Sequence, residues 1–156
     1  MAIIEFARNK LKIKKAGSTE LDRNCYPVVG LINEWSKDGK IIRGTDKDLG
    51  GTMRLGSYDA ILSNNTLIRK IYGSKLIKER HRHRYEVNKN YKDKFEKKGL
   101  IFSGNSPDKN LPEIIELKNH PWFIGVQFHP EFKSRPLNPH PLFSSFIKAA
   151  KSFNGK

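Results

Sequence analysis

The chain has 156 residues, of which 37% are hydrophobic and 29% are charged, as is typical of one globular domain with a real core. No apolar run approaches the roughly 20 residues of a membrane-spanning helix, and the N-terminus lacks the features of a secretory signal. The single cysteine, Cys25, excludes an internal disulfide framework and fits a reducing compartment.

The net charge is +14, because 30 basic residues outnumber 16 acidic ones. Such a charge attracts nucleic acid and other polyanions. The lysines, however, are scattered through polar segments of the sequence such as residues 88–92, Asn-Lys-Asn-Tyr-Lys. We therefore interpret the charge as a solvated surface, and we do not expect a nucleic-acid partner.

The N-terminal half of the chain contains few predicted elements. Residues 2–11 have apolar side chains at helical spacing. Residues 12–50 are punctuated by glycine and are predicted to be loops. Residues 61–62 belong to a possible short strand, and residues 65–72 have the pattern of a helix.

The C-terminal half predicts more regular structure. A short helix is expected over 91–98, with Gly99 as its cap, followed by strands over 100–103, 113–117 and 122–128. A final helix begins near Leu142, where apolar residues recur at helical spacing. Strands interleaved with helices indicate a layered α/β fold. Because no helix separates the last three strands, part of the sheet is expected to be antiparallel.

The most informative segment is the apolar strand that ends in His129-Pro130-Glu131. Proline cannot continue a hydrogen-bonded ladder, so His129 is expected where the strand stops, with Glu131 on the following turn. Ligands of open α/β sheets bind at the carboxyl ends of strands. A histidine steadied by a carboxylate is two-thirds of a nucleophilic triad. The alternative is that His-Pro-Glu is only a turn.

A second unusual segment is Arg-His-Arg-His-Arg at 80–84. In an extended chain the three arginines point one way, and His81 and His83 point the other way. The two histidines are a weak metal signal without a third ligand. The arginines allow three interpretations. They could form a patch that binds phosphate or nucleic acid, or a charged edge strand. Alternatively, one arginine binds a substrate carboxylate while the others pair with Glu79 and Glu86.

Three further segments are weaker candidates for a functional site. Cys25 lies in a loop beside proline, which is unlike the elbow that activates a nucleophilic thiolate, so we interpret it as a small apolar filler. The glycine-rich residues 50–56 lack the Gly-Lys-Ser/Thr ending of a phosphate-binding loop. Residues 18–20, Ser-Thr-Glu, either start a helix or present Glu20 to a ligand.

Taken together, these motifs resemble the C-terminal part of the glutamine amidotransferase domain of the CTP synthase family. The resemblance covers nearly the whole chain. The segments that occur in family order are residues 4–9, 18–20, 50–56, 79–88, 113–116, 127–132, 139–143 and 146–150. The resemblance implies a partial class I glutamine amidotransferase domain over residues 1–156, truncated at its N-terminus. Its α/β fold is expected to hold a mixed, mostly parallel sheet flanked by helices.

The family hydrolyses glutamine through a Cys-His-Glu triad and supplies the ammonia for ATP-dependent amination of UTP to CTP. The resemblance implies that His129 is the general base and that Glu131 orients it. Glu20 matches the carboxylate that receives the α-amino group of glutamine, and Arg84 matches the arginine that pairs with its α-carboxylate. Arg43 lies where the family has an arginine linked to activation by GTP.

The family's nucleophile elbow, oxyanion-hole glycines and synthase domain precede the segment that this chain matches. We therefore expect the chain alone to be inactive, with no metal or cofactor of its own. The parent enzyme uses ATP and Mg²⁺ in its synthase domain, is activated by GTP, and forms a homotetramer in the cytoplasm, without a membrane. The alternative is a repurposed, non-catalytic module that binds glutamine, a partner protein or nucleic acid.

Overall fold

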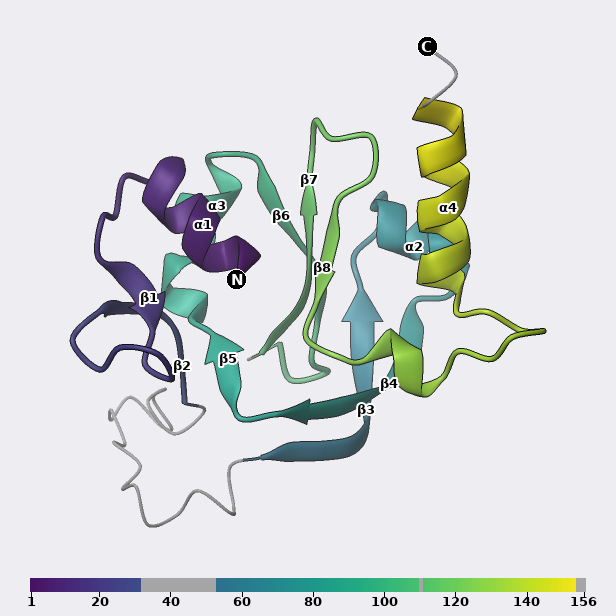
Figure 1. The fold of residues 1–156 in the computed structure, drawn as a ribbon, viewed down its shortest axis with the longest axis horizontal. Helices are drawn as coiled ribbons and strands as arrows, with labels where there is room; N and C mark the ends of the chain where they lie inside the picture. Colours follow the sequence, from purple (N-terminus) through teal and green to yellow (C-terminus); the bar gives the residue numbers. More distant parts are fainter. Residues whose placement is uncertain (32–52, 110, 154–156) are drawn as a thin grey trace. The chain divides into compact units, whose positions relative to one another are not determined.

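The computed structural model describes residues 1–31, 53–109 and 111–153, so Arg43 lies outside the described residues. The chain divides into two compact units, of which the first comprises residues 1–55 and 82–98 and the second comprises 56–81 and 99–156. Each unit combines helices with strands (Figure 1). The α/β class is therefore confirmed, whereas the single domain over 1–156 stays a prediction.

The first unit places an N-terminal helix beside a small three-stranded sheet. Its elements are α1 (Ala2–Asn9), β1 (Ala16–Ser18), β2 (Tyr26–Leu31) and β5 (Tyr85–Val87), with the strands in the order β1-β2-β5. The apolar face of α1 is buried through Ile3, Ile4 and Ala7, and α1 contacts both β1 and β2. The predicted N-terminal helix is thus confirmed, and its amphipathic stripe explains why it forms.

The segment 12–50, predicted to be rich in loops, also contains the strands β1 and β2, which the sequence did not predict. β1 pairs with β2 in parallel, and β2 pairs with β5 in antiparallel orientation. The sequence signal for these strands is weak for two reasons. β1 has only three residues, and β2 contains Pro27 and Gly30, residue types that are depleted in strands. Pairing with neighbouring strands outweighs these local preferences.

The first unit also contains a 3₁₀ turn, η3 (Lys89–Tyr91), that leads into the short helix α3 (Lys92–Glu96). The predicted helix over 91–98 is confirmed in a shorter form. It ends before Gly99, the predicted cap, which nevertheless has a positive φ of 90°. The ring of Phe95 is fully buried and lies 5.9 Å from the ring of Phe6 on α1. This aromatic contact ties α3 to α1.

The second unit is built on a sheet with the strand order β4-β3-β6-β7-β8. Its strands are β3 (Arg54–Leu62), β4 (Leu76–His83), β6 (Leu100–Asn105), β7 (Pro112–Leu117) and β8 (Ile124–Val126). The first residues of β3 and the last residues of β4 belong to the first unit. The pairs β3–β6, β6–β7 and β7–β8 are antiparallel. The three predicted strands are confirmed, although β8 is shorter than the predicted 122–128.

The expected mostly parallel sheet is wrong for the described strands. Of the strand pairs with a defined register, only β1–β2 is parallel among the described residues. In the sheet of the second unit, the physical reason is that short connections join β6, β7 and β8, which favours antiparallel pairing of consecutive strands. β8 is also half-buried rather than fully buried, as its position at the end of the strand order predicts.

Two helices accompany this sheet, α2 (Leu67–Tyr72) and α4 (Pro141–Phe153), and they contact each other (Figure 1). Both were predicted from their apolar spacing. The core of the second unit joins residues from three strands, both helices and the segment after β8. Its buried members are Ala60, Leu62, Ile68, Ile77, Ile114, Phe128 and Leu142. No helix among the described residues is long and apolar enough to cross a membrane.

A carboxylate from β7 caps the N-terminus of α2. Both oxygens of the buried Glu116 accept hydrogen bonds, from the backbone N–H groups of Leu67 and Ile68, each at 2.9 Å. The hydroxyl of Thr66 accepts a third hydrogen bond, from the N–H of Arg69 at 3.3 Å. Three of the free donors at this helix end are therefore paired, and the negative charge lies at the positive end of the helix.

We expect Glu116→Ala to lower the free energy of unfolding by about 1.5–3 kcal/mol, because it leaves two donors at a buried helix end unpaired. Thr66→Ala removes one neutral cap and should cost about 1 kcal/mol. Urea denaturation followed by circular dichroism measures both values. Equal losses for the two variants would contradict the role of the carboxylate.

Candidate functional site

The structure brings His129 and Glu131 into direct contact. Nδ1 of His129 lies 2.7 Å from Oε1 of Glu131. His129 precedes the 3₁₀ turn η4 (Pro130–Phe132), whose first residue is the proline that the sequence predicted would end the strand. The turn shortens the path between the two side chains, so residues two apart in sequence can meet. The predicted His-Glu pairing is thus present as a hydrogen bond.

This geometry fixes which ring nitrogen of His129 is available for chemistry. A carboxylate only accepts hydrogen bonds, so Nδ1 carries the proton and Nε2 presents a lone pair. The hydrogen bond from His129, partly offset by burial, holds the pKa of Glu131 below its ordinary value. Glu131 therefore remains charged at neutral pH and stabilises the imidazolium that forms when Nε2 accepts a proton.

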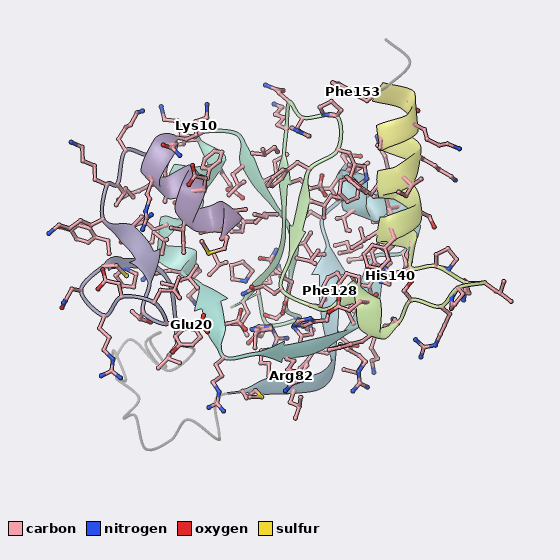
Figure 2. All side chains as sticks on the ribbon, viewed as in Figure 1. Lys10, Glu20, Arg82, Phe128, His140 and Phe153 are labelled. Carbon is pink, nitrogen blue, oxygen red and sulfur yellow. The ribbon has the colours of Figure 1, made fainter. Side chains whose placement is uncertain are left out.

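The pair lies near the surface on a segment with little burial of its own. The side chains of His129 and Glu131 are 37% and 55% exposed. The ring of His129 stacks on Phe132 with 4.9 Å between ring centroids. Phe128, labelled in Figure 2, precedes the pair and is buried in the core of the second unit. The core thus fixes the chain immediately before His129, while the functional groups remain accessible.

Glu20 and Arg84 lie at the same end of the three-stranded sheet in the first unit. Ser18 of β1 pairs with Val29 of β2, and Val29 pairs with Val87 of β5. β1 runs on toward Glu20, while the antiparallel β5 begins just after Arg84, so the two residues flank one end of the sheet. Figure 2 labels Glu20, which is exposed. The sheet register, rather than proximity in sequence, places both residues at this end of the sheet.

Arg84 differs from the other arginines of its segment. Arg80 and Arg82 lie on the exposed face of β4, whereas Arg84 follows the end of the strand and is half-buried. Nη1 of Arg84 is buried and has no hydrogen-bond partner among the described residues, and the same holds for the hydroxyl of Thr19 beside Glu20. A buried guanidinium nitrogen without a partner costs free energy, so an anion that pairs with it is stabilised.

The alternation predicted for residues 80–84 is confirmed along β4, which ends at His83, but Arg84 lies beyond the strand and does not share the exposed face of Arg80 and Arg82. Ile77, Glu79 and His81 are buried on one face of β4, while Arg80 and Arg82 are exposed on the other. His81 lies 3.7 Å from Glu113, and both side chains are fully buried.

The predicted pairing of Glu79 and Glu86 with the neighbouring arginines is wrong for both carboxylates. Glu86 lies 3.4 Å from both Arg54 and His83. Glu79 receives its hydrogen bonds from Tyr72, Lys133 and His140. The exposed arginines point away from this buried face because neighbouring residues of a strand alternate between its two faces.

Cys25 packs closely against Gly17, within the first unit. A Cβ atom added at Gly17 would lie 2.7 Å from Cβ and 2.8 Å from Sγ of Cys25. The contact leaves no room for a side chain at position 17. This close packing agrees with the interpretation of Cys25 as a filler.

The structure also shows a buried polar cluster that the sequence did not reveal. Oε1 of Glu79, a residue only 1% exposed, accepts hydrogen bonds from Tyr72 at 3.0 Å, from His140 at 3.1 Å and from Lys133 at 3.3 Å. Burial raises the pKa of Glu79, but the hydrogen bond and charge of His140, the charge of Lys133 and the hydrogen bond of Tyr72 outweigh it, so the net pKa is lowered. Burial and the neighbouring carboxylate raise the pKa of Tyr72, which therefore stays a donor.

Comparison with known proteins places this geometry in a family. Residues 2–149 match the family Glutamine amidotransferase class-I. The chain is 79% identical over 152 residues to the CTP synthase of Pelagibacter ubique and 61% identical over 151 residues to that of Sphingopyxis alaskensis. The matches cover 97% and 96% of this chain, which spans only 28% of the length of each relative.

A solved structure supports the same assignment. The glutaminase domain of Trypanosoma brucei CTPS with bound acivicin superposes with a TM-score of 0.82 at 32% identity. The match covers 97% of this chain and 56% of that chain. The expected class I fold and the resemblance to CTP synthase are therefore confirmed. The chain belongs to the class I glutamine amidotransferase family, and its sequence and fold are those of part of a CTP synthase glutaminase domain.

Proposed function

We propose that this chain supplies the histidine and carboxylate of a glutaminase site that delivers ammonia for the synthesis of CTP. The observation that carries the proposal is the 2.7 Å hydrogen bond between Nδ1 of His129 and Glu131. This contact leaves Nε2 free to accept a proton, which is what a general base next to a nucleophilic thiol requires. Family membership and the similarity to CTP synthases support the same reaction.

The proposed reaction begins when a thiol transfers its proton to Nε2 of His129 as its sulfur attacks the amide carbon of glutamine. His129 then gives this proton to the leaving nitrogen, which departs as ammonia. Water, deprotonated by His129, hydrolyses the thioester to glutamate and releases the thiol. Because Cys25 packs against Gly17, we propose that the thiol comes from the part of the relatives that this chain does not span.

Two residues of the first unit are proposed to hold the substrate. The Glu20 carboxylate binds the α-ammonium group of glutamine, and the Arg84 guanidinium binds its α-carboxylate. Nη1 of Arg84, which has no hydrogen-bond partner in the described part of the chain, supports this role, because a bidentate arginine–carboxylate pair would satisfy it. The binding of UTP, ATP and Mg²⁺ and the assembly of a homotetramer are assigned to the rest of the parent enzyme. The role of Arg43 in the response to GTP remains a proposal.

A chimera tests the proposed function. In it, this chain replaces the matching 152 residues of the Pelagibacter ubique CTP synthase. We expect the chimera to form CTP with glutamine as the nitrogen source and the separate 156-residue chain to release no ammonia from glutamine. A chimera that forms CTP from added ammonia but not from glutamine would contradict the proposal. If that chimera still bound glutamine, it would favour a non-catalytic binding module.

A further inference from the structure

The turn that carries His129 and Glu131 has no buried residue of its own. The backbone hydrogen bonds of η4 span a single turn, from Phe132 N–H to His129 O at 3.2 Å and from Lys133 and Ser134 N–H to Pro130 O at 3.1 and 3.2 Å. A single 3₁₀ turn has poor hydrogen-bond geometry and is weakly determined by itself. The 2.7 Å contact within the pair therefore depends on what holds the two ends of the turn.

Both ends of the turn are attached to strand β4. The backbone N–H of His129 donates to the carbonyl of Arg80 at 2.8 Å. At the other end, Nζ of Lys133 donates to the carbonyl of Lys78 at 2.6 Å and to Oε1 of Glu79 at 3.3 Å. Three consecutive residues of β4 thus hold the five residues from His129 to Lys133, and Glu79 contributes a charged side chain where Lys78 and Arg80 contribute backbone carbonyls.

Glu79 also fixes the chain beyond the turn. Its Oε1 accepts a hydrogen bond from Nε2 of His140, and the N–H of His140 donates to the hydroxyl of Ser134 at 3.1 Å. His140, labelled in Figure 2, lies immediately before α4. The hydroxyl of Tyr72 on α2 completes the set of donors. Because the carboxylate is buried, loss of its charge would weaken every one of these attachments together.

We propose that Glu79 is a positioning residue for the His129–Glu131 pair, acting through Lys133 and His140 on the turn that runs from His129 to Lys133. This inference rests on the proposed function only for the catalytic role of the His129–Glu131 pair. The hydrogen bonds that hold the turn are contacts within the second unit and do not depend on that role. A carboxylate that served stability alone would leave the His129–Glu131 hydrogen bond unchanged in every folded variant. A positioning carboxylate would not.

The carboxyl group of Glu131 provides a direct readout of the pair. Its pKa is lowered chiefly by the hydrogen bond from His129, so any loosening of this hydrogen bond raises it. Loss of the negative charge of Glu79 would, by charge effects alone, shift the pKa of Glu131 downward. Positioning and simple electrostatics therefore predict opposite signs for the variant Glu79→Gln.

The experiment is a ¹³C NMR titration of the 156-residue chain with labelled glutamate carboxyl groups. Glu131→Gln identifies the resonance by its loss, and His129→Ala defines the titration midpoint without the hydrogen bond. We expect Glu79→Gln to shift the Glu131 midpoint upward by at least half of the shift in His129→Ala. Glu116→Gln is the matched control, a buried carboxylate of the same unit that caps α2, and should leave the midpoint unchanged.

The outcomes separate the two proposals. An unchanged or lowered midpoint in folded Glu79→Gln overturns the positioning role. No shift in His129→Ala would show that the pair does not form in solution, which counts against the proposed function instead. If Glu79→Gln does not fold, Lys133→Met is measured in about 1 M salt, where screening over ~3 Å suppresses direct charge effects. An upward shift there supports positioning, and its absence overturns it.

Discussion

Replacing His129 by alanine in the chimera is expected to lower glutamine hydrolysis by roughly 10⁴–10⁶-fold, because members of a catalytic triad act as a unit. Without the imidazole, no group accepts the thiol proton or returns it to the leaving nitrogen. Formation of CTP from added ammonia does not need this proton transfer and should be unchanged. A coupled assay for ammonia release, run beside an assay for CTP with each nitrogen source, measures both.

His120→Ala is the matched control for this prediction. It removes an exposed imidazole in a loop of the same unit, whose Nδ1 accepts a hydrogen bond from the backbone N–H of Trp122 at 3.2 Å. Its glutamine-dependent rate should stay close to that of the unchanged chimera. Retention of glutamine hydrolysis within tenfold in His129→Ala, with the control intact, would show that another group serves as the base.

The contrast between these two histidines illustrates what the sequence could reveal about the site. His129 was predicted because proline follows it directly, which was expected to end the strand, and because a carboxylate comes two residues later; β8 in fact ends earlier, at Val126. Both signals are local, and the structure confirms the contact that they predicted. The roles of Glu20 and Arg84 were suggested only by resemblance. The sheet register that places them at one end depends on pairing between strands about 60 residues apart.

The buried polar cluster around Glu79 was not predicted from the sequence, for a related reason. Its partners come from α2, from the turn after His129 and from the residue before α4, and no local pattern links these segments. One signal was available, because alternation along β4 puts Glu79 on the same buried face as Ile77 and His81. A glutamate on a buried face needs donors. The sequence instead suggested its neighbouring arginines, which point the other way.

The same distinction applies to the fold. Helix α4 and strands β6 and β7 were predicted because each has a long or strongly apolar pattern of its own. β1 and β5 have only three residues each, and they are strands because β2 lies between them. The mostly parallel sheet was expected from the resemblance, but the short connection from β7 makes β8 antiparallel to it.

Arg84→Ala in the chimera is expected to raise the KM for glutamine by roughly 30- to 4,000-fold, since loss of one partner of a buried charge pair costs about 2–5 kcal/mol. If Arg84 binds only the α-carboxylate, which takes no part in the chemistry, the ground state and the transition state lose the same interaction. The kcat should then change little. Steady-state kinetics with glutamine as the varied substrate separates the two parameters.

Two variants sharpen this prediction. Arg82→Ala removes the same charge from the exposed face of β4 and should leave KM nearly unchanged, so a general loss of positive charge cannot produce the effect. Arg84→Lys keeps the charge but not the planar fork, and it should recover only part of the affinity because lysine cannot form the bidentate pair. A lysine variant with full affinity would mean that Arg84 acts as a point charge. An alanine variant with unchanged KM would remove Arg84 from the binding site altogether.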